Sequence, residues 1–222
     1  MARLIIDLLR HGRCDDGAIY RGRTDSPLSS SGLAQMESAI AAMVESSSQA
    51  GPGWQQILCS PLQRCSVPAA SFARQLQLPL VVEPDLRELD FGQWEGLPLE
   101  QVWQQQLQQV MAFWQDPDRN PPPDGESLQA LRQRLQALMQ GWLAKVEEGS
   151  ERRLLCVTHG GVVRAIICML LGLPGASAQQ LSLDYASLSR VELYPDNEGL
   201  SEHGYHAQLI FFNRRALLSD YD

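Results

Sequence analysis

Strand-like apolar segments alternate with segments of helical periodicity along this chain, and the alternation restricts its fold more than any other feature. The strand-like segments of the first half are Leu4–Leu9, residues 54–60 and residues 78–84. Between them lie a helical repeat that follows Ser29–Ser31 and a second one at residues 61–76. Because strands that alternate with helices form parallel sheets, we expect an α/β fold. Leu4–Leu9 is almost continuously apolar, which is typical of a strand covered on both faces.

The second half of the chain extends this pattern. A glutamine-rich stretch at about 97–148 has helical character but contains a proline-rich loop, so we expect a helical excursion over one face of the domain. Leu154–Val157 is strand-like again and leads into an apolar helix. Residues 187–195 and 205–213 predict a closing hairpin with at least one antiparallel strand. No repeat or linker stands out, and we expect a single domain over residues 1–222.

Composition excludes several classes of protein. With 44% hydrophobic and 20% charged residues, the chain can build a core and fits neither a disordered protein nor a coiled coil. Its formal net charge of −8 argues against general nucleic-acid binding but leaves room for a local cationic pocket. The 18 basic residues include a single lysine, Lys145. Arginine suits carboxylate and phosphate, although drift in an arginine-rich genome is the simpler explanation of the bias.

The cysteines and the amino-terminal segment predict the compartment. The five cysteines are odd in number and form no Cys-x-x-Cys pair, so neither a disulfide framework nor a structural zinc site is indicated. The apolar run at the amino terminus is interrupted at Asp7 and Arg10, which argues against a signal peptide, and no segment has the length of a membrane span. We expect a soluble cytoplasmic protein with no membrane partner.

Polar residues follow three of the predicted strands. Arg10 and His11 end the first, Ser60 ends the second with Arg64 one helical turn on, and His159 ends a later one. Ligands of doubly wound sheets bind beyond the carboxyl ends of the strands, so we expect these side chains to converge. Each histidine taken alone fits a structural role equally well. Together, two arginines and two histidines near helix amino termini favour a phosphate site.

A phosphate held in this way permits metal-free chemistry. A neutral imidazole aligned with phosphorus can attack it in line while the surrounding cations stabilise the charge on the oxygens. An acid is then needed for the leaving alkoxide, and a base for water. The acidic cluster that could supply it is Asp85, Glu88, Asp90 and Glu95, although each of these taken alone is more often a solvated loop charge.

Six motifs in one order resemble a known family. They are "LLRHG", "YRGRTDSPLSSSGLAQ", "CSPLQRC", "LRELDFGQWEG", "PPPDGES" and "VTHGGVVRAI". The chain resembles the histidine phosphatase superfamily, the phosphoglycerate-mutase-like enzymes, over most of its length. The resemblance implies a three-layer α/β/α sandwich whose central sheet is mostly parallel, with an antiparallel edge strand. It implies no cofactor and no metal.

The resemblance also implies a role for each matched residue. His11 would become phosphorylated, and Glu88 would protonate the leaving oxygen and then activate the water that cleaves the phosphohistidine. The phosphate pocket would consist of Arg10, Arg64 and His159, with the amide of Gly160 as an extra donor. All five side chains are expected to take part in catalysis.

The loop after the first motif departs from the family pattern. Arg13 and Cys14 stand where the family commonly has an acid and a hydroxyl residue. Cationic surroundings could lower the thiol pKa of Cys14, but a packed or hydrogen-bonded thiol is the better expectation. Arg21 and Gly22 are candidate phosphate contacts. For Arg21, a salt bridge to one of the acids at residues 15, 16 and 25 is an equal alternative.

Within the superfamily, the motifs are most similar to bacterial α-ribazole 5′-phosphate phosphatases, which act in cobalamin biosynthesis. We therefore expect a phosphomonoesterase for a small-molecule phosphate monoester. The alternatives are a broad-specificity sugar or nucleotide phosphatase, a phosphoglycerate-mutase-type phosphotransferase and, least favoured, a non-catalytic phosphate-binding scaffold. The oligomeric state stays open between monomer and homodimer.

Substrate choice is expected to depend on residues 13–25 and on the segment around residues 94–123. Trp103, Phe113 and Trp114 could stack on a base, although packing in the core is favoured. Residues 124–127 are expected to begin a helix, with a role near the pocket as the alternative.

Overall fold

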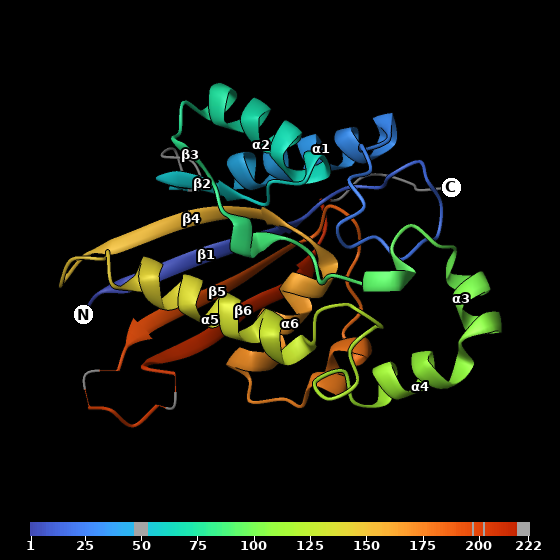
Figure 1. Cartoon of the computed structure of the whole chain (residues 1–222). Coiled ribbons are helices and arrows are strands. Elements are labelled where there is room, and N and C mark those ends of the chain that lie inside the picture. Colours follow the sequence, from blue (N-terminus) through green and yellow to red (C-terminus); the bar gives the residue numbers. More distant parts are fainter. Residues whose placement is uncertain (47–52, 197, 202, 217–222) are drawn as a thin grey trace.

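The central element of the fold is a six-stranded sheet with the strand order β3-β2-β4-β1-β5-β6 (Figure 1). The computed structural model describes residues 1–46, 53–196, 198–201 and 203–216. The strands are β1 (Arg3–Arg10), β2 (Gln56–Cys59), β3 (Leu80–Val82), β4 (Glu151–Thr158), β5 (Leu188–Pro195) and β6 (Tyr205–Arg214).

The sheet is mostly parallel, as predicted. β1 pairs with β4, β4 with β2 and β2 with β3, all in parallel register. β5 runs antiparallel to both of its neighbours, β1 and β6. The reversed strand therefore lies one position inside the sheet, and β6 forms the edge beyond it. The predicted hairpin is present as β5 and β6, although residues 197 and 202 of its connection lie outside the described residues.

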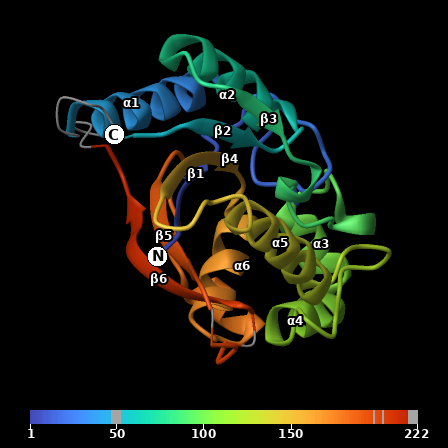
Figure 2. The ribbon, with the colours of Figure 1, turned by 90° about the vertical axis from the view of Figure 1, so that its left-hand side faces the viewer.

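Helices cover both faces of the sheet, which confirms the three-layer α/β/α architecture (Figures 1 and 2). Figure 2 shows α1 and α2 on one side of the strands and α5 and α6 on the other. The α-helices are α1 (Ser30–Ser46), α2 (Gln63–Leu76), α3 (Leu99–Gln105), α4 (Leu107–Gln115), α5 (Leu128–Leu143) and α6 (Gly160–Leu170). Three short 3₁₀ helices are η1 (Pro84–Leu86), η2 (Gly92–Trp94) and η3 (Gly175–Gln180).

The alternation of side chains along the strands divides the core into two clusters. Leu155 and Val157 of β4 face α1 and α2, where they join Phe72. Leu154 and Cys156 face the other way and pack with residues of α5 and α6. Because both faces of β4 are buried, the strand is apolar at every position from Leu154 to Val157.

Asp7 is a charged residue within the apolar run of β1, and its partners explain its position. The side chain is fully buried. Its carboxylate accepts hydrogen bonds from Arg190 at 2.8 and 2.9 Å and from the indole nitrogen of Trp54 at 2.6 Å. A buried carboxylate is tolerated only when paired in this way.

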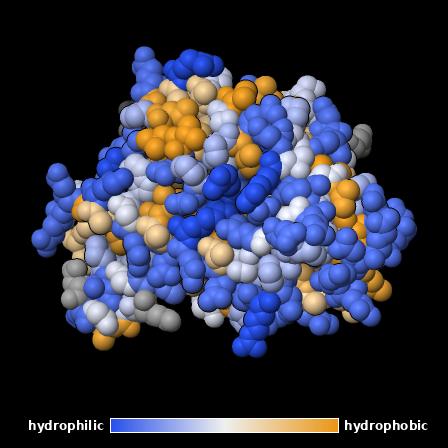
Figure 3. Space-filling view, in the orientation of Figure 1, coloured by the Kyte–Doolittle hydropathy of each residue, from blue (hydrophilic) through white to orange (hydrophobic). Residues whose placement is uncertain are grey.

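The segment expected to be a helical excursion contains α3, α4 and α5. The chain leaves helical geometry at Gln106, between α3 and α4, and the side-chain oxygen of Gln106 accepts a 2.7 Å hydrogen bond from the indole of Trp94. On the face seen in Figure 3, the surface is mostly hydrophilic with an apolar patch over α2 and β3, which carry the exposed Val67 and Val82. None of the helices in the described ranges is long and apolar enough to cross a membrane.

Candidate active site

Three neighbouring strands bring the polar residues together at one edge of the sheet. β2, β4 and β1 are adjacent, and their carboxyl ends lead into Ser60, His159 and His11. The backbone N–H of His11 donates to the carbonyl of Thr158 at 2.9 Å, which places the two histidine segments side by side. The rings of His11 and His159 lie 5.3 Å apart between centroids. The convergence expected from the parallel sheet is therefore present.

His11 is held as a neutral imidazole. Its Nδ1 lies 2.7 Å from the carbonyl oxygen of Gly12, which can only accept a hydrogen bond, so Nδ1 carries the proton. Burial and the nearby Arg64 guanidinium hold the pKa of His11 well below its usual value. The imidazole is consequently neutral at pH 7, and Nε2 has a free lone pair.

His159 has the opposite tautomer. Its Nδ1 accepts a 3.1 Å hydrogen bond from Nε of Arg64, because a guanidinium can only donate. The proton of the neutral ring therefore lies on Nε2, which donates to the Ser60 hydroxyl at 2.8 Å. Burial and the charge of Arg64 lower the pKa of His159 well below its usual value. His159 is thus neutral, and the positive charge at the site comes from the arginines.

Arg64, in the first turn of α2, is completely buried. Besides His159, its guanidinium donates to the carbonyls of Thr24 at 2.7 Å, Gly22 at 2.8 Å and Arg21 at 3.3 Å. These four contacts occupy four of its five N–H groups and leave one for a phosphate oxygen. Arg64 therefore joins the loop at residues 21–24 to His159 in addition to any contact with substrate.

Arg10, at the end of β1, contacts a different segment of the chain, around Leu183 and Tyr185. Its guanidinium stacks 4.0 Å above the ring of Tyr185 and donates through Nη1 to the carbonyl of Leu183. Within the described ranges, its buried Nε has no hydrogen-bond partner. A buried donor without a partner is costly, so an anionic ligand is the natural partner for this group.

Glu88 lies in the loop between η1 and η2 and reaches the amino terminus of α6. Its Oε2 accepts a 2.9 Å hydrogen bond from the N–H of Gly161, and its Oε1 accepts one of the same length from the N–H of Leu89. A Cβ at Gly161 would lie 2.3 Å from Oε1, so only glycine permits this approach. Glu88 is thereby aimed at the start of the helix that follows His159.

The segment around Glu88 is fastened by Arg134 of α5. Arg134 donates to the carbonyl of Asp85 and, at 3.3 Å, to that of Glu88. It forms a two-fold ion pair with Glu126 at 2.8 and 2.9 Å. The hydroxyl of Ser127 caps α5 by accepting from Ala130, as expected. Glu126 therefore also has the role near the pocket that the sequence left as an alternative. Its ion pair positions Arg134, and Arg134 in turn contacts the loop that carries Glu88.

Two other acids of the predicted cluster, Asp90 and Glu95, have structural partners. Asp90 pairs with Arg23 at 2.6 Å. Glu95 accepts from the backbone N–H groups of Gly22, Arg23 and Thr24 and from the Thr24 hydroxyl. Burial alone would raise the pKa of Glu95, but these hydrogen bonds outweigh it and the pKa is lowered. Of the four acids, only Glu88 lines the cavity described below.

Arg21 and Gly22 form hydrogen bonds that stabilise the loop in which they lie. Arg21 pairs with Asp16 and also donates to the carbonyl of Gly17 at 2.8 Å, so the salt-bridge alternative describes its position. The N–H of Gly22 donates to Glu95 at 3.2 Å and is therefore occupied. The expected phosphate contact from Gly22 does not fit this hydrogen bond, and a Cβ there would lie 2.1 Å from the carbonyl of Leu89.

Arg13 and Cys14, the positions that depart from the family pattern, differ in exposure. Arg13 is exposed, and its carbonyl accepts from the Ser29 hydroxyl at 3.0 Å. Cys14 is buried, and burial raises the pKa of its thiol in spite of the nearby Arg21. Cys14 is thus a packed thiol, and the lowered pKa considered from the sequence is wrong.

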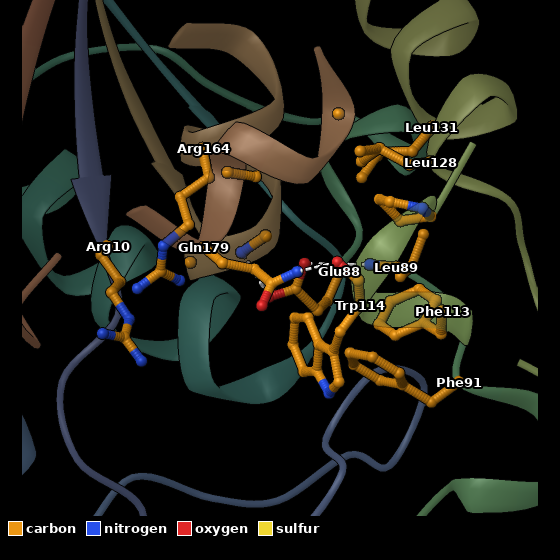
Figure 4. A pocket seen from close by; sticks show the side chains of 15 residues that line it. Arg10, Glu88, Leu89, Phe91, Phe113, Trp114, Leu128, Leu131, Arg164 and Gln179 are labelled. Atoms are coloured by element: carbon orange, nitrogen blue, oxygen red, sulfur yellow. Dashed lines mark hydrogen bonds between the residues drawn. The ribbon is translucent and has the colours of Figure 1, made fainter. Parts of the chain in front are cut away.

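A cavity of about 350 Å³ opens beside Arg10 and Glu88 (Figure 4). Gly160 and Gly161, at the start of α6, line it together with Trp114. Phe113 also borders the cavity but is almost completely buried, which fits the packing role expected for it. Trp103 is 42% exposed and does not line the cavity.

Comparison with known proteins gives the family. The family model for the histidine phosphatase superfamily (branch 1) matches residues 6–205. The chain belongs to this superfamily. It is 27% identical over 190 residues to the adenosylcobalamin/alpha-ribazole phosphatase of Escherichia coli (strain K12), covering 84% of this chain and 88% of that one. It is 32% identical over 197 residues to a probable phosphoglycerate mutase of Proteus mirabilis, covering 85% of each.

A solved structure gives the same result at the level of the fold. The mycobacterial glucosyl-3-phosphoglycerate phosphatase is 25% identical, with a TM-score of 0.80 over 97% of this chain and 100% of that one. The superfamily and these phosphatase relatives make the chain a phosphoric monoester hydrolase. Its substrate is a small-molecule phosphate.

Sequence reasoning missed three residues of this histidine phosphatase. Tyr185 lies under Arg10, and Arg164 and Gln179 line the cavity. Arg164 had a detectable signal, because it lies four residues after Gly160 on a predicted helix and so shares its face. Tyr185 and Gln179 follow α6 in a segment without periodicity, where no pattern indicated their direction.

Proposed function

We propose that this chain hydrolyses phosphate monoesters without a metal, through a phosphohistidine at His11. The observation that carries the proposal is the hydrogen bond between Nδ1 of His11 and the carbonyl of Gly12, which leaves Nε2 as the attacking atom. Arg10 offers the unpartnered Nε and Arg64 one N–H for the phosphate oxygens. Gly160, at the start of α6, would add a backbone donor and the positive end of the helix.

In the first step, the lone pair of Nε2 attacks phosphorus and the bond from phosphorus to the leaving oxygen breaks. Glu88, protonated at this stage, transfers its proton to that oxygen, so that the alcohol leaves neutral. The arginines stabilise the charge on the three remaining phosphate oxygens. The hydrogen bonds from Gly161 and Leu89 keep the carboxyl group in place for the transfer.

In the second step, the ionised carboxylate of Glu88 takes a proton from water. The water oxygen attacks phosphorus, the bond between phosphorus and Nε2 breaks, and inorganic phosphate leaves. Glu88 is protonated again and Nε2 recovers its lone pair, so the cycle closes without a cofactor. His159 stays neutral throughout; both of its ring nitrogens are occupied, by Arg64 and by Ser60, so it positions Arg64 for the phosphate rather than binding the phosphate itself.

As substrate we propose α-ribazole 5′-phosphate, in cobalamin biosynthesis. The support is the likeness to the Escherichia coli enzyme together with a cavity of about 350 Å³ whose aromatic wall suits a ring-bearing alcohol. A broad-specificity sugar or nucleotide phosphatase is the alternative, favoured by the polar side chains on the other wall of the same cavity.

A substrate screen of the purified enzyme tests this proposal. The panel contains α-ribazole 5′-phosphate, nucleotides, sugar phosphates and phosphoglycerates, each measured with and without EDTA. We expect hydrolysis that EDTA does not change and vanadate inhibits, with the largest kcat/KM on α-ribazole 5′-phosphate. Loss of activity in EDTA would contradict the mechanism, whereas similar kcat/KM values across the panel would favour the broad-specificity alternative. Stimulation by a bisphosphorylated primer would instead indicate a mutase.

We also propose that the enzyme works in the cytoplasm as a single domain. Five free cysteines, all buried, suit a reducing compartment.

A further inference from the structure

The cavity beside Glu88 has two unlike walls. Phe91, Phe113 and Trp114 form an apolar wall on one side (Figure 4). Arg10 and Arg164 reach it from the other side, with Glu88 between the two (Figure 4). Arg10 is accounted for by the phosphate. Arg164 is a second cation in the wall, and the proposed mechanism gives it no role.

Arg164 differs from the other partly buried arginines in its partners. Arg21 pairs with Asp16 and Arg134 with Glu126. Arg164 donates through Nε to the carbonyl of Leu181 at 2.9 Å, and across the described ranges it has neither an ion pair nor a further hydrogen bond. Its two terminal nitrogens, which carry four N–H donors, are therefore available to a ligand.

The position of these donors fits the leaving alcohol of the substrate. A Cβ at Gly160 would lie 3.1 Å from Nε of Arg10 and 3.1 Å from Nη1 of Arg164, so the two guanidinium groups flank the same backbone atom. Both guanidinium groups line the same cavity as Glu88. Because Glu88 protonates the leaving oxygen in the proposed mechanism, the leaving alcohol would lie in this cavity, within reach of Arg164. Burial lowers the pKa of Arg164, which shows that its charge is partly desolvated and would gain from an acceptor.

We infer that Arg164 is a specificity-determining residue that binds an oxygen acceptor on the leaving alcohol, while Trp114 and Phe91 contact the apolar remainder. The acceptor is either a carboxylate or a sugar hydroxyl, both of which match a forked donor. This inference rests on the proposed hydrolysis at His11 and adds to it the chemistry of the leaving group.

The test compares three esters that differ in their acceptors. Phenyl phosphate has none, ribose 5-phosphate has hydroxyls, and phosphoglycolate has a carboxylate. For each acceptor ester, kcat/KM is divided by that for phenyl phosphate in the same enzyme, so that any general effect on catalysis cancels. In Arg164→Met we expect this ratio to fall by about ten- to hundredfold for one of the two acceptor esters, the loss typical of a hydrogen bond to a charged group. The ester affected identifies the acceptor.

Arg132→Met is the matched control. Arg132 of α5 donates to the carbonyl of Leu173 at 3.0 Å and so fastens the same segment after α6, but it does not line the cavity. We expect this variant to keep the ratios of the parent even if its Tm falls. Ratios that are unchanged in Arg164→Met, or that change equally in both variants, would overturn the inference.

The inference would also be overturned if the parent enzyme hydrolysed phenyl phosphate but neither of the two acceptor esters. A parent without phosphatase activity on any of the three would contradict the proposed function instead, and the two failures are thereby distinguishable.

Discussion

At the residue scale, each site histidine is neutral, but a different partner fixes its proton. The carbonyl of Gly12 places the proton of His11 on Nδ1, whereas Arg64 places that of His159 on Nε2. One ring thereby keeps the lone pair of its Nε2 free for the proposed attack on phosphorus, and the other is fixed between Arg64 and Ser60. The sequence could predict that both histidines meet at the sheet edge, because strand ends converge. It could not predict the tautomers, which depend on hydrogen bonds across the fold.

The lowered histidine pKa values predict a loss of stability in acid. Both values lie below the ordinary value near 6.5 in the folded protein, while the unfolded chain takes up protons near that pH. As the pH falls below about 6.5, the unfolded state binds more protons and the free energy of unfolding decreases. We expect Tm to fall between pH 7 and pH 5, and to fall less in His159→Gln. Equal slopes in scanning calorimetry would contradict the neutral, buried state of His159.

At the scale of elements, the site depends on the contacts that Arg10 and Glu88 make with the start of α6. Gly161 lets Glu88 approach the helix more closely than a Cβ there would allow, and a Cβ at Gly160 would make a tight 3.1 Å contact with Nε of Arg10. The glycines after the second histidine were visible in the sequence as a sign of close approach, and so were the strands and α2. The break between α3 and α4 was not, because Gln106 carries no turn signal and its hydrogen bond to Trp94 forms only once the chain has folded.

Gly161→Ala is expected to impair catalysis more than folding. The new Cβ would lie 2.3 Å from Oε1 of Glu88, and the end of that flexible side chain can move aside. A displacement of about 1 Å at a reacting group costs about a hundredfold in rate. We therefore expect kcat to fall by about two orders of magnitude with little change in Tm.

Gly141→Ala is the control for this substitution. Gly141 lies in α5 with no other atom near its would-be Cβ, so alanine there should preserve activity and raise stability by about 1 kcal/mol. If the Gly161 variant kept the kcat of the parent, the position assigned to Glu88 would be wrong.

At the scale of the whole molecule, the sheet separates two apolar clusters that share β1 and β4. Asp7 lies on the face of the sheet that α1 and α2 cover, and its pairing with Arg190 joins β1 to β5. The sequence indicated the apolar strand but gave no reason for the acid within it, since Arg190 and Trp54 are far away in the chain. The clusters are built on the same strands, which supports our proposal of a single domain.

Asp7→Asn tests this view of the core. The variant leaves the Arg190 cation unpaired beside a fully buried position, so we expect the free energy of unfolding to fall by about 3 kcal/mol. Asp116→Asn, at the exposed pair with Arg119, should cost less than about 1 kcal/mol. Denaturant unfolding followed by tryptophan fluorescence and by far-UV circular dichroism should give coincident transitions. Separate transitions would contradict the single domain.

Rapid-quench labelling with a ³²P-phosphomonoester, stopped in alkaline denaturant and mapped by peptide analysis, tests whether His11 carries the phosphoryl group. We expect label on His11 that appears within the first turnover, is removed by unlabelled substrate at the turnover rate, and is absent from His11→Ala together with the activity. Label on another residue, or hydrolysis by His11→Ala at the parent rate, would contradict this role of His11.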